Sequence, residues 1–156
     1  MRREALFVLL LGLILAAGLL LVLNVTRYPQ SSIAEKSSGD ITVRAEPADV
    51  RAGEPVHLKL IVNGPSTYDN CSPVTFWATD LRGRKAWVSG HFWVCATHQL
   101  GVIARGEQQT FATDWPTTGM ASGAYTVHGV FLQSLAKPGD FLPSENLPVL
   151  TVTLSR

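Results

Sequence analysis

Residues 74–88, VTFWATDLRGRKAWV, decide the fold, because they have the pattern of two strands joined by a short turn. Apolar side chains alternate at Val74, Phe76 and Ala78, and a second apolar run begins at Ala86. A period of two residues is typical of β-strands. The intervening LRGRK holds one glycine, and a short glycine-centred loop between two such runs is typical of a β-hairpin.

The register of this hairpin connects it to the two cysteines of the chain. A loop over residues 82–84 predicts these opposed pairs: Thr79 with Trp87, Phe76 with Gly90, and Cys71 with Cys95. Directly opposed residues lie about 4.5–5.5 Å apart at Cα, which a disulfide can bridge. Pro73 cannot donate to a strand ladder, and a bulge there would place Val94 opposite Cys71 instead.

The same alternation continues outside the hairpin. The apolar positions are Ile41, Val43 and Ala45, then Val56, Leu58, Leu60 and Val62, with further runs at 86–94, 111–115, 124–132 and 149–154. Gly, Pro, Asn and Asp separate these runs. The pattern predicts an all-β body over residues 41–156, an immunoglobulin-like antiparallel β-sandwich of seven or eight strands.

The N-terminus has the composition of a membrane anchor. The 19 residues from Ala5 to Leu23 carry no ionisable side chain and would span about 28 Å as a helix. Arg2 and Arg3 precede them, which favours a cytoplasmic N-terminus and an extracytoplasmic body at the inner membrane. We therefore expect a single-pass anchor over residues 1–26, with a cleaved signal peptide as the alternative. The serine-rich residues 27–40 predict a flexible tether.

Beyond the membrane, thiols oxidise, so two cysteines predict one disulfide between Cys71 and Cys95. The alternative is a zinc site made of Cys71, His91, Cys95 and His98. It lacks the Cys-x2-Cys spacing usual for zinc, and an oxidising compartment favours the disulfide. We expect neither a metal nor another cofactor.

Composition and motifs argue against two broad classes of function. Thirteen Lys and Arg against twelve Asp and Glu leave a net charge of +1, so the chain has no basic excess for nucleic acid. No HExxH motif, phosphate-binding glycine loop or nucleophile elbow is present, and the acidic residues are scattered. The sequence predicts that the protein is not an enzyme.

Two loops and one tryptophan are candidates for binding a partner. The loop over 63–72 is stiffened by proline, and the loop over 137–143 exposes apolar side chains. The candidate residues are Pro65, Tyr68, Trp93, Lys137, Phe141 and Leu142. The alternatives are that the tryptophans belong to the core and that residues 133–147 form a crossover packed on the end of the sandwich.

Several motifs resemble the bacterial intracellular proteinase inhibitor family, the BsuPI-like domains. The resemblance runs from Gly53-Glu54-Pro55-Val56 through the hairpin DLRGRKAWVS at 80–89 and the Arg105-Gly106-Glu107 turn to Gly123-Ala124-Tyr125-Thr126-Val127. It covers roughly residues 53–132. It implies an immunoglobulin-like fold and inhibition of serine proteinases. The matched residues are turn and core positions, so no inhibitory residue is carried over.

Together, these features predict a membrane-anchored, extracytoplasmic protein-binding module. Its partner would be a protein outside the cytoplasm, either a serine proteinase or a membrane complex. The alternative is an accessory or assembly subunit of such a complex. Gly12 and Ala16 give the expected anchor a small-xxx-small step, which favours packing against other helices.

Overall fold

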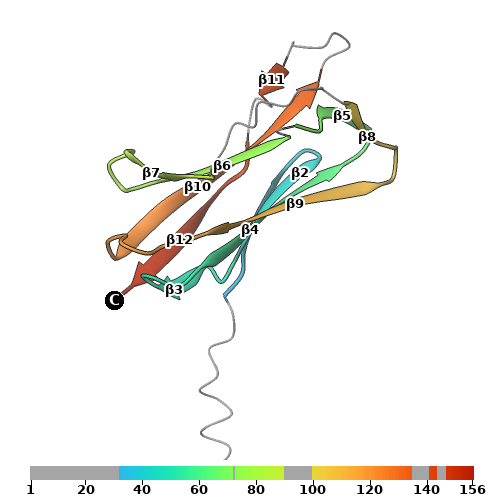
Figure 1. The fold of residues 1–156 in the computed structure, drawn as a ribbon. Helices are drawn as coiled ribbons and strands as arrows, with labels where there is room; N and C mark the ends of the chain where they lie inside the picture. The colour runs from blue at the N-terminus through green and yellow to red at the C-terminus, as the bar shows by residue number, and fades with distance from the viewer. Residues whose placement is uncertain (1–31, 72, 90–99, 135–140, 144–146) are drawn as a thin grey trace, which may run out of the picture. The chain divides into compact units, whose positions relative to one another are not determined.

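The computed structural model describes residues 32–71, 73–89, 100–134, 141–143 and 147–156. This part of the chain forms twelve β-strands and no helix (Figure 1), which confirms the all-β prediction. None of its segments is a helix long and apolar enough to cross a membrane. The anchor expected at 5–23 lies outside the described residues.

The strands form two sheets. The first has the order β1 (Ala34–Ser38), β2 (Ile41–Glu46), β4 (Val56–Asn63) and β9 (Gln108–Trp115), all antiparallel. The second contains β3 (Asp49–Arg51), β12 (Val149–Ser155), β10 (Gly123–Ser134), β6 (Val74–Thr79), β7 (Lys85–Val88), β5 (Ser66–Asp69), β8 (Leu100–Ile103) and β11 (Phe141–Pro143).

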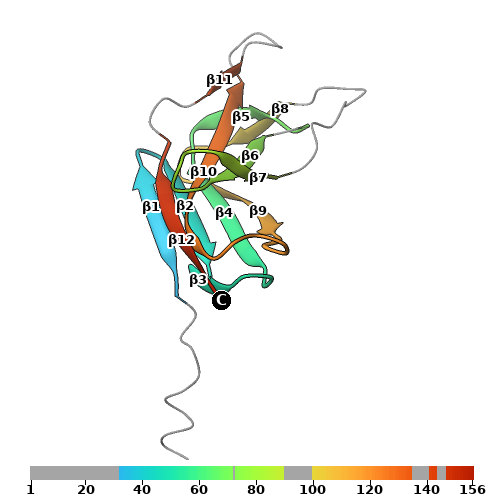
Figure 2. The same cartoon turned by 90° about the vertical axis from the view of Figure 1, so that its left-hand side faces the viewer.

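Strand β10 organises the second sheet. Its first half pairs with β12 on one side, its middle pairs with β6 on the other, and its end pairs with β5 and β11. Figures 1 and 2 show β10 extending past the body of the sandwich to the end where β5, β8 and β11 lie. Strand β7 pairs with β6 and completes the hairpin that the sequence predicts.

The core lies between the two sheets and follows the predicted period of two. Exposed or half-buried residues alternate with buried ones along β4 and β12. The buried apolar side chains include Val43, Ala45, Val56, Leu58, Leu60, Val62, Phe76, Ala78, Trp115, Val127, Phe131, Val152 and Leu154. Removing these side chains from water stabilises the sandwich by about 25 cal/mol for each Å² of apolar surface.

Two expectations about local structure need correction. The tether expected over 27–40 is a strand in part, because Ala34–Ser38 form β1 and pair with β2. The strand count is twelve within the described residues rather than seven or eight. The additional strands, β1, β3, β5, β8 and β11, have three to five residues each, and segments of this length carry little periodicity.

The hairpin register is one residue away from the predicted one. Trp77 pairs with Val88 and Ala78 pairs with Trp87, whereas the prediction paired Thr79 with Trp87. The ladder shifts between Ala78 and Thr79, so an irregularity next to the turn moves the register. Cys95 lies outside the described residues, and the described part contains no free cysteine. The Cys71–Cys95 disulfide therefore remains a prediction.

Candidate functional site

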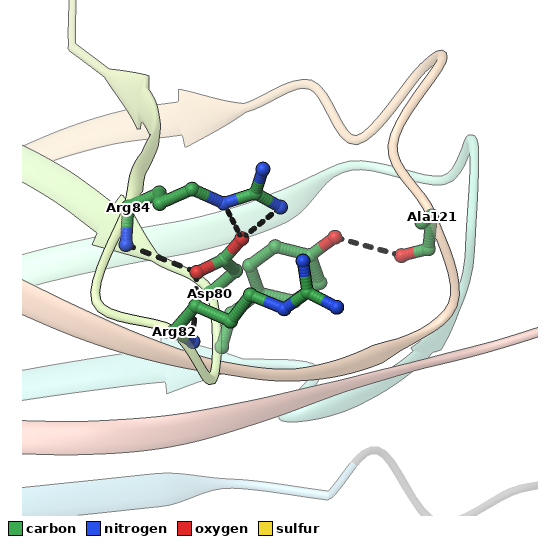
Figure 3. Close-up of polar contacts among 5 residues, drawn as sticks. Asp80, Arg82, Arg84 and Ala121 are labelled. Atoms are coloured by element: carbon green, nitrogen blue, oxygen red, sulfur yellow. Dashed lines mark hydrogen bonds and ion pairs between the residues drawn. The ribbon is translucent and has the colours of Figure 1, made fainter.

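The turn between β6 and β7 is held by one carboxylate, that of Asp80. Its Oδ1 accepts hydrogen bonds from the backbone N–H groups of Arg82 at 2.9 Å and Arg84 at 3.0 Å. Its Oδ2 accepts from the Arg84 guanidinium, at 2.8 Å from Nε and 2.7 Å from Nη2 (Figure 3). The Gly83 N–H donates to the Asp80 carbonyl, and Gly83 adopts a positive φ of 74°. The backbone of the turn is therefore fixed from both sides.

This arrangement also fixes the charge of the turn. The Arg84 N–H bond, together with the Arg84 side chain and the Arg82 N–H, holds the pKa of Asp80 below 3.8, although partial desolvation opposes the shift. Asp80 is thus ionised at neutral pH and paired with Arg84. The Arg82 guanidinium has no ion-pair partner among the described residues, and Lys85 lies 5.9 Å from the centre of the Trp77 ring. The turn presents excess positive charge.

A groove lies between this turn and the loop that follows β9. We call residues 80–85 the hairpin tip, and we call the cavity of about 610 Å³ beside it the tip groove. One wall comes from the hairpin tip and Ala86, and the other from residues 119–125. Figure 3 shows the Arg82 side chain extending from the turn toward the Ala121 wall.

The second wall is fixed by bonds of its own. The buried Tyr125 ring lies in β10, and its hydroxyl donates to the Ala121 carbonyl at 2.8 Å (Figure 3). Upstream, the Trp115 Nε1–H donates to the Met120 sulfur at 3.2 Å. The fully buried Thr117 hydroxyl accepts from the Gly53 N–H and donates to the Glu54 carbonyl. These contacts tie the wall to the first sheet.

The residues of the tip groove suit binding rather than catalysis. Arginine and lysine bind anionic groups, and the small residues Gly119, Ala121 and Gly123 leave room for an extended chain. The lining contains no histidine or cysteine, and its single carboxylate, Asp80, is already hydrogen-bonded. In the described part of the chain, no three potential metal ligands gather.

The candidate residues predicted from the sequence lie elsewhere. Pro65 precedes β5, and Tyr68 lies on β5 with its ring against Phe111 and Phe131, at centroid distances of 5.3 and 5.8 Å. Tyr68 also packs over Gly101, where a Cβ atom would clash with its ring. Tyr68 thus serves mainly to close the core at the β5 end.

The other candidates lie in β11 or outside the described residues. Phe141 and Leu142 belong to β11, which pairs with the end of β10, so this segment is a strand where an irregular loop was expected. Trp93, Lys137 and Cys95 lie outside the described residues, as do His91 and His98 of the zinc alternative. The described structure brings none of the candidates to the tip groove.

The tryptophans and histidines of the described residues make contacts within the fold. Trp115 is fully buried and stacks on Trp87, with centroids 5.7 Å apart. Trp77 stacks on His128 at 4.9 Å, and burial lowers the pKa of His128. His57 is exposed, and its Nδ1 lies 2.6 Å from Asp114 Oδ1. His128 is half-buried.

Leu81 and Arg82 are the site residues that sequence reasoning missed. Leu81 is 84% exposed, the largest exposed fraction among the large apolar side chains of the described residues. The sequence predicts a turn at Asp80-Leu81-Arg82-Gly83-Arg84, and the structure confirms it. The apolar and basic residues at its centre were the available signal of a surface role, since turn positions usually carry small polar residues.

Comparison with known proteins finds a solved structure with a similar fold. No family model matches the chain, and no curated protein matches it. Among solved structures, it is similar to the crystal structure of the C-terminal domain of wzt, with 15% sequence identity and a TM-score of 0.51. The match covers 81% of this chain and 77% of that one. At this identity the likeness supports the β-sandwich fold and leaves function open.

Proposed function

We propose that this protein is a binding module that presents its hairpin tip to a partner protein. The observation that carries the proposal is Leu81, an apolar side chain left 84% exposed on a turn whose backbone Asp80 fixes. Because the backbone of the turn is already ordered, burial of Leu81 against a partner costs little backbone entropy, and preorganisation of this kind raises affinity. The tip groove beside it offers a concave surface for the same partner.

Two features support the immunoglobulin-like assignment within the sandwich. Strands β2, β4 and β9 form one layer, while β12, β10, β6 and β7 form the other in that order. The Tyr125 hydroxyl bonds back to the carbonyl four residues upstream, as in the tyrosine corner of immunoglobulin-like domains. Modules of this kind commonly bind partners through the turns and loops at their ends.

The membrane anchor and the inhibitor role rest on the sequence. The anchor rests on residues 5–23, and inhibition of a serine proteinase rests on the family resemblance over 53–132. Substrate-like inhibitors insert an extended backbone into the enzyme cleft. Residues 80–84 instead form a tight turn whose amide groups bond to Asp80, so the hairpin tip fits a partner that accepts a compact protrusion.

Site-specific photo-crosslinking of the full chain tests the binding role. A photoreactive amino acid at position 81 is expected to capture a defined partner, and the same group at Ile33, which is 50% exposed elsewhere, is not. The variant Leu81→Asp is expected to lose co-purification of that partner, while Ile33→Asp retains it. Equal capture at both positions, or equal retention by both variants, would contradict the proposal.

The identity of the captured protein separates the narrower roles. A serine proteinase whose activity falls on addition of the purified chain supports inhibition. A fixed set of multi-span subunits supports the accessory-subunit alternative, for which the expected anchor would supply further contacts. Capture of a proteinase that keeps full activity at saturating chain argues for binding without inhibition.

A further inference from the structure

We propose that the tip groove receives an acidic segment of the partner protein, with a carboxylate bound by Arg82. This inference rests on the proposed function and adds the chemistry of the partner. Lysine and arginine occupy three positions on the hairpin wall, and Asp80 is the single acidic residue of the lining. The charge of the groove therefore calls for an anionic occupant.

The hydrogen bonds show which cations are available. Both Asp80 oxygens are engaged, and the Arg84 guanidinium supplies two of their donors, so this pair is internally neutral. The Arg82 side chain makes no hydrogen bond or ion pair within the described part of the chain, and it extends from the turn toward Ala121 (Figure 3). A guanidinium with its donors free binds a carboxylate with two parallel hydrogen bonds.

The opposite wall favours a peptide as the carrier of that carboxylate. Gly119, Ala121 and Gly123 have little or no side chain, so a second backbone can approach them closely. Ser122 adds an exposed hydroxyl, and Leu81 at the rim offers an apolar contact. An acidic segment that also carries an apolar side chain matches these surfaces. A flat anionic bilayer matches them poorly, because the lining residues form a concave surface.

Direct binding of short peptides to the full chain in uncharged detergent tests the inference. The probes are a fluorescent peptide of glutamate and leucine and its isosteric partner, in which glutamine replaces glutamate. We expect the acidic peptide to bind at low salt and weaken as salt rises, and the glutamine peptide not to bind. Arg82→Glu is expected to weaken the acidic peptide by at least about tenfold.

A matched control variant distinguishes binding in the tip groove from general electrostatic attraction between the acidic peptide and the protein. Arg105 is an exposed arginine in the turn after β8, so Arg105→Glu makes the same change of charge away from the groove. We expect Arg105→Glu to bind the acidic peptide like the wild type and Arg82→Gln to bind it weakly. Circular dichroism and the unfolding midpoint show that each variant folds. Equal losses in Arg82→Glu and Arg105→Glu would overturn the inference.

Two further results would also overturn the inference. Binding to phosphatidylglycerol vesicles that depends on Arg82, without binding of the acidic peptide, would overturn the inference in favour of a membrane surface. Capture of a protein partner through Leu81 that is unaffected by Arg82→Glu would also overturn it. In that case the proposed function stands, so the two failures are distinguishable.

Discussion

At the scale of single residues, Asp80 couples the shape of the hairpin tip to its charge. The same carboxylate accepts two backbone N–H groups and pairs with Arg84, so the turn and the availability of Arg82 depend on one ionised group. Because these bonds lower the pKa of Asp80 in the folded protein, its contribution to stability has a defined dependence on pH.

We predict that Asp80→Asn lowers the urea midpoint at neutral pH and that its difference from the wild type disappears in acid. A carboxyl group whose pKa is depressed by folding stabilises above its unfolded value of 3.8 and loses this effect as pH falls through the lower folded value. Urea titrations across this range measure the effect. Asp40→Asn, at an exposed aspartate, is the control, and a difference that persists in acid would argue against the interpretation.

We predict that Tyr125→Phe destabilises the domain by about 1 kcal/mol, the usual net value of one hydrogen bond. The lost bond runs from the buried hydroxyl to the Ala121 carbonyl at 2.8 Å. Tyr68→Phe is the matched control, because the Tyr68 hydroxyl makes no hydrogen bond with the described residues. Equal free energies of unfolding for the two variants would refute this role of Tyr125.

The sequence identified Asp80 and Tyr125 but assigned them only to turn and strand positions. The bonds of Asp80 depend on how the turn folds, and the bond of Tyr125 depends on the approach of a loop four residues upstream. Arg82 was not predicted as a binding residue, because its availability follows from Arg84 being the partner of Asp80. Spacing alone does not distinguish these two arginines.

At the scale of elements, β8 is an edge strand without charged side chains. It pairs with β5 alone within the described residues, and its sequence Leu-Gly-Val-Ile carries no charge. Leu100 and Val102 are 61% and 69% exposed. In contrast, β1 carries Glu35 and Lys36, and charged residues on edges protect sheets from pairing with other chains.

We predict that Val102→Lys reduces aggregation of the protein on heating or at high concentration. A lysine on an exposed edge strand opposes edge-to-edge pairing, and the exposed position tolerates it. Light scattering during a thermal ramp measures the effect. Ile33→Lys removes a comparably exposed apolar side chain outside any strand, so an identical gain from both variants would assign the effect to general hydrophobicity.

Longer elements were predictable and short ones were not. In β4 and β12, eight and seven residues alternate between buried positions and half-buried or exposed ones, and the apolar positions predicted in β4 are confirmed as buried. Strands β3 and β5 have three and four residues and owe their pairing to neighbours distant in sequence. The hairpin was found, but its register was wrong by one residue, since a local irregularity next to a turn leaves no trace in periodicity.

At the scale of the whole molecule, the expected anchor determines where the module operates. We predict that the full chain stays in the membrane fraction after alkaline extraction and that removal of residues 1–26 releases it. Nineteen residues without an ionisable group partition strongly into hydrocarbon. Protease treatment of intact cells with a permeabilised outer layer should digest the body. Release of the full chain by alkali, or protection of the body, would contradict the predicted topology.

We predict that Cys71 and Cys95 resist alkylation until a reductant is added. In the chain-entropy model, a bridge that closes a loop of about 25 residues stabilises a protein by about 3.5 kcal/mol. Mass spectrometry of the non-reduced protein measures the two thiols, and Cys71→Ser should lower the free energy of unfolding. Two alkylated cysteines in protein isolated from its own compartment would exclude the bridge.

The hydroxyl of Thr117 provides a way to detect occupancy of the tip groove from a distance. It accepts the Gly53 N–H at 2.8 Å and belongs to the same loop as the groove wall at 119–125. A ligand that draws this wall inward would alter that hydrogen bond, whereas one that touches only Leu81 would not. The deuterium uptake of a single amide, that of Gly53, would therefore distinguish the two modes of attachment without a label near the bound molecule.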